Sequence, residues 1–138
     1  MRVFLVTLLC LLSNHVFANT ELLLIDPWVR QAPPTAKNLA GYGELKNTSS
    51  NIIEIVSIES KLFEKVEMHI TTFENGMMRM AEVKKLILKP GESVYFEPGG
   101  RHFMLIKPNT AIVSGLIVPV LITLSSGEKI NYEMHVRR

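Results

Sequence analysis

Two histidines and two methionines in this chain are spaced so that their soft donor atoms could gather around one metal ion. The pattern reads His69, ten residues, Met80, twenty-one residues, His102, one residue, Met104. Methionine sulfur is an uncharged, polarizable ligand, and together with imidazole nitrogen it favours Cu(I) over hard ions such as Ca²⁺ or Mg²⁺. Because no cysteine lies near these residues, the pattern indicates a protein that holds copper rather than reacting with it.

The first pair of donors is positioned by a hairpin, which the dipeptide Asn75-Gly76 predicts because a type I′ turn needs positive φ at both central positions. If these two residues form the loop, Thr71 faces Met80. Side chains alternate between the faces of a strand with period two. We therefore expect His69 and Met80 to share a face as diagonal neighbours, about 7–8 Å apart at the backbone, where one ion could bridge them.

The second pair follows the same rule of alternation. One residue separates His102 from Met104 on a predicted strand, so both project to one side. The turn at residues 98–100 precedes them and could bring the start of the strand to the edge of the domain, while Phe103 and Leu105 face the core. Two such pairs could converge on a four-ligand site, because closed-shell Cu(I) accepts tetrahedral geometry.

Other soft side chains are assigned by the face on which they fall. In the predicted hairpin register, Met68 and Met77 lie opposite to the donor face, and we expect them to pack in the core. Met78 shares the donor face and could lie next to the ligands. Met134 and His135 are adjacent in a strand and point opposite ways, so we interpret His135 as a surface residue.

From Leu22 onward, β-prone runs alternate with turn signals every eight to twelve residues, which is typical of an all-β sandwich or barrel. The predicted strands are Leu22–Ile25, Trp28–Gln31, Gly41–Lys46, Ile52–Ser57, Val66–Phe73, Met77–Val83, Leu86–Leu88, Ser93–Phe96, His102–Ile106, Val118–Leu124 and Lys129–Val136. The hairpin is expected to pair Val66–Phe73 with Met77–Val83. A single helical turn is expected at Ser60–Lys65.

Residues 1–18 are typical of a secretory signal peptide, with a positive start, a short apolar run and small residues before a cleavage point after Ala18. The apolar run falls short of the about 20 residues that a membrane span needs, so we expect no stable membrane insertion. Cleavage leaves residues 19–138 as a single secreted β domain and removes Cys10, the only cysteine. A formal net charge of +2 without a basic stripe argues against nucleic-acid binding.

The donor spacing resembles the signature of the periplasmic copper(A) chaperone family, PCuAC. The resemblance extends to residues 32–42, 66–69, 76–80, 98–102 and 118–120 and covers nearly all of the mature chain. It implies a cupredoxin-like, Greek-key β-barrel or sandwich. On this resemblance the Cu(I) ligands are His69, Met80, His102 and Met104. It also implies that the protein delivers copper to the dinuclear copper centre of a terminal oxidase, so its partners would be the apo copper domain of that oxidase and other copper chaperones.

The function that these observations favour is uptake of Cu(I) outside the cytoplasm and transfer to another metalloprotein. A cupredoxin-like electron carrier is disfavoured, because blue-copper sites need a cysteine thiolate. An enzyme is the weakest hypothesis, because Asp26 is the only aspartate and no Ser-His-Asp arrangement suggests itself. Two alternatives stay open: a copper storage or sequestration protein, and a metal-free envelope domain that binds protein partners.

Overall fold

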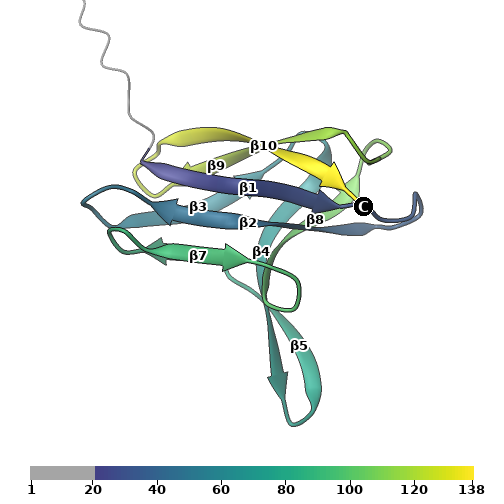
Figure 1. Ribbon diagram of the computed structural model, residues 1–138, viewed down its shortest axis with the longest axis horizontal. Coiled ribbons are helices and arrows are strands. Elements are labelled where there is room, and N and C mark those ends of the chain that lie inside the picture. Colours follow the sequence, from purple (N-terminus) through teal and green to yellow (C-terminus); the bar gives the residue numbers. More distant parts are fainter. Residues whose placement is uncertain (1–20) are drawn as a thin grey trace, which may run out of the picture.

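The computed structural model describes residues 21–138, in which ten β-strands join one continuous sheet (Figure 1). The strands are β1 (Leu22–Arg30), β2 (Asn38–Asn47), β3 (Ile53–Glu59), β4 (Phe63–Glu74), β5 (Met77–Glu82), β6 (Leu86–Leu88), β7 (Ser93–Phe96), β8 (Arg101–Pro108), β9 (Ile117–Leu124) and β10 (Lys129–Arg137). The all-β prediction is confirmed. No helix in the described residues is long and apolar enough to cross a membrane. The predicted signal peptide, residues 1–18, lies outside these residues.

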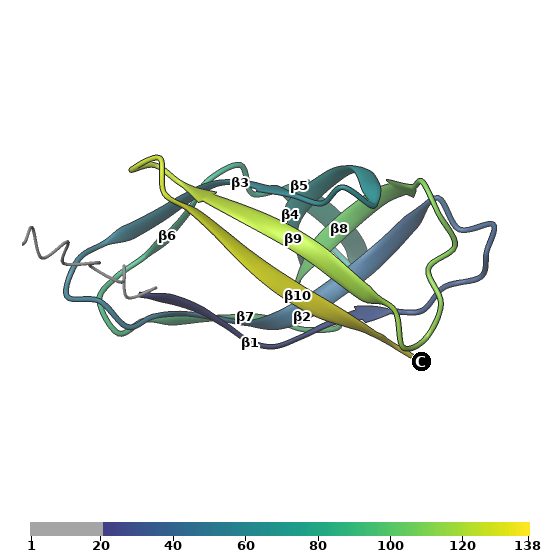
Figure 2. The same cartoon turned by 90° about the horizontal axis from the view of Figure 1, so that it is seen from above.

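The strands follow the order β5-β4-β8-β7-β2-β1-β10-β9-β3-β6. A further pairing of β3 with β4, through Ile58 and Val66, closes eight of these strands into a barrel and leaves β5 and β6 beside the closed ring. Seen from above, β1, β2 and β7 lie along one side of the barrel, and β3 and β4 lie along the other (Figure 2). The pairs β1–β10 and β7–β8 are parallel, and the other pairs are antiparallel.

The core fills the inside of this barrel with alternate residues of the strands. Phe103 and Leu105 on β8 are fully buried, as the sequence predicts. The ring of Phe96 on β7 stacks on Phe103 with ring centroids 4.0 Å apart. Burying each side chain of this size stabilises the fold by about 1.5–3 kcal/mol, so β8 is anchored to the core by its inward residues.

The first strand differs from its prediction. The two expected strands Leu22–Ile25 and Trp28–Gln31 form the single strand β1, in which the register with β2 shifts part of the way along. Asp26 lies at the shift with a φ of 44°, and its carboxylate pairs with the guanidinium of Arg137 on β10 at 2.5 Å. A β-bulge admits extra residues into a strand without ending it, which is why the polar interruption in the sequence does not divide the strand.

The helical turn expected at Ser60–Lys65 is wrong. Residues 61 and 62 form the tight connection between β3 and β4, and β4 begins at Phe63, whose N–H donates to the Ser60 carbonyl at 3.2 Å. The Phe63 ring is buried in the core. Burial of this ring and the short turn favour a hairpin over a helix.

The β4–β5 hairpin extends away from the barrel as an arm, residues 71–82 (Figure 1). Asn75 and Gly76 form its turn with φ values of 52° and 76°, the two positive values that a type I′ turn requires. Thr71 pairs with Met80 in the predicted register. The hairpin prediction is therefore confirmed at its turn and its register.

One residue of the arm differs from its prediction. Met77 was expected in the core, but its side chain is 56% exposed. All six residues of β5 are exposed, because this strand lies outside the closed barrel and has no core to face. Alternation assigns a face of a strand correctly but does not say whether that face is covered.

Gly41 on β2 offers a test of the packing that supports β8. A Cβ atom at this position would lie 2.9 Å from Cε of Met134 and 3.1 Å from Cδ1 of Leu105, both closer than ordinary contact. We expect Gly41→Ala to lower the free energy of unfolding by about 1–3 kcal/mol, because overpacking forces core side chains to shift. Urea unfolding followed by circular dichroism measures this change.

The matched control is Gly100→Ala, where the nearest atoms, in Glu97, lie 3.7 Å from the added Cβ. Equal unfolding midpoints for the two variants would contradict the packing described for Gly41.

Candidate metal centre

The four predicted donors lie on the outward face of three neighbouring strands, β8, β4 and β5. His69 on β4 pairs directly with His102 on β8. The register places Met80, on β5, one diagonal step from His69, and Met104, on β8, one diagonal step to the other side. His69 is therefore the centre of the arrangement, next to each of the other three donors.

The opposite face of the same strands fixes this direction. Met68 and Phe103 pair with each other next to the histidines and are buried in the core. Because neighbouring residues of a strand point to opposite faces, burial of these two side chains turns His69 and His102 outward. The prediction that Met68 and Phe103 belong to the core is confirmed.

The two imidazole rings lie close together, with centroids 5.5 Å apart and planes inclined at 50°. Nε2 of His69 lies 2.6 Å from a carboxylate oxygen of Glu67, and Nδ1 of His102 lies 3.4 Å from the Gly100 carbonyl oxygen. Carboxylate and carbonyl oxygens accept hydrogen bonds, so the histidine nitrogens are the donors in both contacts. Each neutral ring therefore keeps its lone pair on the other nitrogen.

Those other nitrogens, Nδ1 of His69 and Nε2 of His102, are buried and have no hydrogen-bond partner among residues 21–138. A buried polar atom without a partner costs about 1–3 kcal/mol. In metal sites, a ligating histidine donates its second N–H to a carboxylate or a carbonyl, which fixes the ring and leaves the first nitrogen for the metal. His69 and His102 both have this arrangement: one ring nitrogen faces an oxygen acceptor, and the other has no partner.

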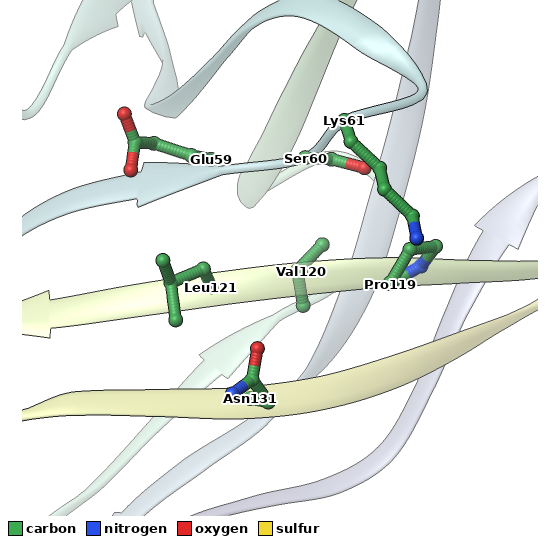
Figure 3. A pocket seen from close by; sticks show the side chains of 7 residues that line it. All are labelled: Glu59, Ser60, Lys61, Pro119, Val120, Leu121 and Asn131. Carbon is green, nitrogen blue, oxygen red and sulfur yellow. The ribbon is translucent and has the colours of Figure 1, made fainter.

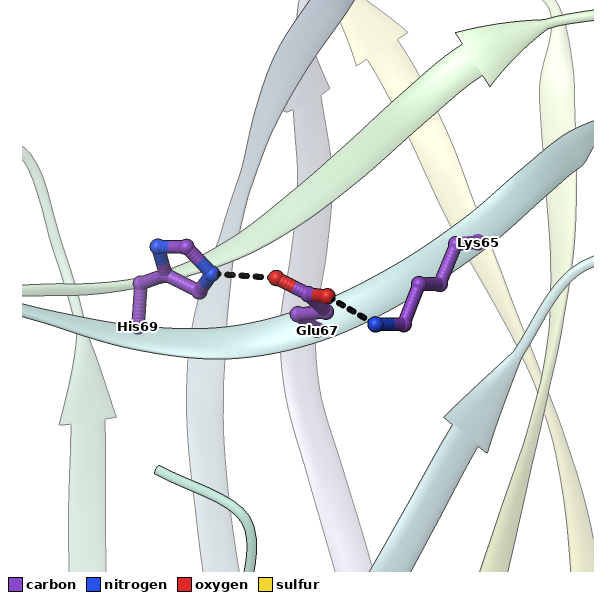
Figure 4. Close-up of polar contacts among 3 residues, drawn as sticks. All are labelled: Lys65, Glu67 and His69. Carbon is purple, nitrogen blue, oxygen red and sulfur yellow. Dashed lines mark hydrogen bonds and ion pairs between the residues drawn. The ribbon is translucent and has the colours of Figure 1, made fainter. Parts of the chain in front are cut away.

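Glu67 connects His69 to Lys65 along the outward face of β4 (Figure 4). The hydrogen bond from Lys65, and then the one from His69, hold the pKa of the Glu67 carboxyl below its usual value. Glu67 is therefore an anion at neutral pH and a strong acceptor for the His69 N–H. A carboxylate behind an imidazole also raises the basicity of the free nitrogen.

His102 is more deeply buried than its partner, at 6% exposure. Burial lowers its pKa below 6.5; the hydrogen bond to Gly100 opposes this shift, and the neighbouring His69 adds to it. The sign of this shift favours the neutral ring. A neutral ring has a lone pair to offer to a metal ion.

Exposure increases across the arrangement from β8 towards the arm. His102 and Met104 are buried and half-buried, the His69 side chain is 16% exposed, and Met80 is 56% exposed. Three donors thus belong to the barrel, and the fourth comes from an exposed strand. The arrangement is open to solvent on the side of β5.

Other parts of the described chain offer different chemistry. Met134 is buried and His135 exposed, as predicted from their alternation. Residues 21–138 contain no group of three or more His, Cys, Asp or Glu side chains placed to hold a metal ion.

A hollow of about 350 Å³ on β3, β9 and β10 contains neither histidine nor methionine (Figure 3). Its lining residues are Glu59, Ser60, Lys61, Pro119, Val120, Leu121 and Asn131.

Two groups at the site were missed in the sequence: the Glu67 carboxylate and the Gly100 carbonyl. Both lie two residues before a histidine, so the same alternation that joins His102 to Met104 could have placed Glu67 beside His69. The direct pairing of the two histidines carries no local signal, because it depends on the long-range register between β4 and β8.

The hydrogen bonds predict opposite tautomers for the two histidines in the metal-free protein. We expect His69 to carry its proton on Nε2 and His102 on Nδ1, because only these nitrogens face acceptors. Two-bond ¹H–¹⁵N NMR spectra above pH 7 distinguish the two forms. Glu67→Leu should shift His69 towards a mixture of tautomers and leave His102 unchanged; the same tautomer in both rings of the wild type would contradict the arrangement.

Known structures share this fold. The copper-bound PCuAC domain from PmoF2 matches with a TM-score of 0.70 at 17% identity, over 85% of this chain and 92% of that domain. The Cu(I) form of DR1885 from Deinococcus radiodurans matches with a TM-score of 0.68 at 24% identity, over 87% of this chain and 83% of that protein. The predicted cupredoxin-like fold is confirmed.

Sequence relatives include the putative lipoprotein Lxx21020 of Leifsonia xyli, 30% identical over 72% of this chain, and protein RP573 of Rickettsia prowazekii, 32% identical over 66%. The matched part of this chain spans 60% and 52% of the lengths of these relatives. The model of the family described as putative lipoprotein LpqE-like matches residues 22–136. The chain therefore belongs to the LpqE-like family, which is the PCuAC family that its sequence resembles.

Proposed function

We propose that this protein is a periplasmic copper chaperone, which binds Cu(I) and delivers it to the dinuclear copper centre of a terminal oxidase. The proposed ligands are His69, Met80, His102 and Met104. The observation that carries the proposal is the pair of buried, unpartnered imidazole nitrogens on a face that also holds two thioethers. Membership of the PCuAC family and the copper named in two structural neighbours support the choice of metal.

The donor chemistry favours Cu(I) within the class of soft ions. Two neutral imidazoles and two thioethers add no negative charge, and a closed-shell ion accepts the tetrahedral geometry that four such donors favour. The Cu(I) form should be colourless, since no thiolate is available to give the intense visible band of a blue-copper site. In an oxidising compartment thioethers also survive where free thiols would be lost, unless they are oxidised to the sulfoxide.

Protons compete with copper only at the two histidines, because thioethers do not titrate. The lowered pKa of His102 keeps its ring neutral down to a lower pH than an ordinary histidine. The affinity for Cu(I) should therefore be nearly constant above pH 7 and fall as the pH drops below the ordinary histidine value of about 6.5.

Transfer is favoured over storage by the position of Met80. This proposed ligand is 56% exposed on β5, so a partner could displace it without unfolding the barrel. A storage protein would gain from enclosing all its ligands. A metal-free domain is disfavoured, because a pair of buried histidine nitrogens without partners would only cost it stability.

The ligand assignment predicts one tight Cu(I) equivalent in the wild type, measured by competition with a chromophoric Cu(I) chelator. Met80→Leu and His102→Ala should each weaken binding about tenfold or more, which is at least about 1.4 kcal/mol, because each removes one donor. His135→Ala serves as the matched histidine control, since that side chain lies on the surface of β10 away from the site. Unchanged affinity in both ligand variants, with the fold intact, would contradict the assignment.

The delivery role predicts that the Cu(I)-loaded protein passes its copper to an apo oxidase copper domain within minutes under reducing conditions. The acceptor gains its copper spectrum after reoxidation, and elemental analysis of the separated proteins checks the transfer. If the copper stays on the donor, and deletion of the gene leaves oxidase activity unchanged in copper-poor medium, storage becomes the better account of the same ligands.

A further inference from the structure

The arm carries a second pair of same-face soft donors besides the pair on β8. Met78 and Met80 are separated by one residue on β5, the same spacing that places His102 and Met104 on one side of β8. Met78 pairs with Phe73 across the hairpin, and Met80 pairs with Thr71. The two thioethers therefore point to the same face of the arm, roughly 7 Å apart along the strand.

The surroundings of Met78 suit a soft cation and offer little apolar cover. Met78 is 60% exposed and Phe73 is 69% exposed. The face from Thr71 to Met80 is uncharged, because the ion pair of Glu74 and Arg79 lies on the opposite face of the hairpin. A thioether here meets no cation that would repel Cu(I), and the Met78 side chain is largely exposed.

We propose that Met78 provides a second, weaker position for Cu(I), through which the ion enters and leaves the main site. The inference rests on the proposed copper function and adds to it a path along the arm. Side-chain exposure increases outward along one line of donors, from buried His102 through His69 to Met80 and Met78. A Cu(I) ion moving along this line can bind the next side-chain donor before its bonds to the previous donors have all broken.

The step itself is an exchange of ligands. Sδ of Met78 donates a lone pair to the ion that Met80 holds, and the bonds from the ion to the barrel ligands His69, His102 and Met104 break one after another. The copper stays Cu(I), so no electron is transferred, and no proton moves because thioethers do not titrate. The resulting two-thioether complex, held by Met78 and Met80, lies on the exposed edge strand β5, where an acceptor can supply the next ligand.

The structure supplies a matched control for this proposal. Met77 is next to Met78 on the same strand and is almost equally exposed, at 56%, but it pairs with Glu74 on the opposite face of the arm. Met77→Leu and Met78→Leu each remove one thioether sulfur from a side chain of nearly equal exposure. Only the second removes it from the donor face.

The experiment follows Cu(I) transfer from the loaded protein to an apo oxidase copper domain by rapid mixing, and measures the equilibrium affinity of each variant with a chelator. Met78→Leu should keep the single tight equivalent within about twofold but slow transfer about tenfold, which corresponds to a barrier about 1.4 kcal/mol higher. Met77→Leu should change neither quantity. With ¹³C-methyl methionine, a second equivalent of Cu(I) should shift the Met78 methyl signal and leave that of Met77 in place.

The outcomes separate the two proposals. If the wild type takes up no tight Cu(I), the copper function fails and the path along the arm fails with it. If the wild type binds Cu(I) tightly but Met78→Leu transfers it as fast as Met77→Leu does, the path is overturned and the copper function stands.

Discussion

The register between β4 and β8 is the constraint on which the candidate site depends. It sets His69 beside His102 on the outward face and Met68 beside Phe103 in the core. A shift of one residue would turn one histidine inward and bring one of the core side chains out to solvent. The apolar packing on the inner face therefore determines the geometry of the polar face. No disulfide or helix in the described residues is needed to hold the two histidines in place.

Hydrogen bonding then decides what the histidine pair can do. Each ring has one N–H bonded to an oxygen, and each has a second nitrogen that is buried without a partner. Two such atoms cost the metal-free fold about 1–3 kcal/mol each, a cost that a bound soft ion would remove. Binding of a metal ion by these two nitrogens would therefore stabilise the fold. Met80 on the arm is 56% exposed. In the proposed site, the barrel would therefore supply three ligands, and the exposed arm would supply the one that a partner could reach.

Local signals in the sequence account for the hairpin and for which residues share a face. Asn75-Gly76 requires a two-residue turn, and that turn fixes the register that places Thr71 opposite Met80. The error at Met77 arises because alternation says nothing about whether a face is covered. The pairing of His69 with His102 could not be derived, since the register between distant strands depends on how the whole core packs. The ligand role of the four donors stays a prediction, supported by the spacing and by family membership.

X-ray absorption spectroscopy of the protein loaded with one equivalent of Cu(I) is the decisive measurement, because it counts the sulfur and nitrogen atoms around the metal. We expect two sulfur and two nitrogen neighbours in the wild-type protein, and the loss of one sulfur in Met80→Leu. A first shell of nitrogen and oxygen alone, or a shell that is unchanged in Met80→Leu, would contradict the proposed site.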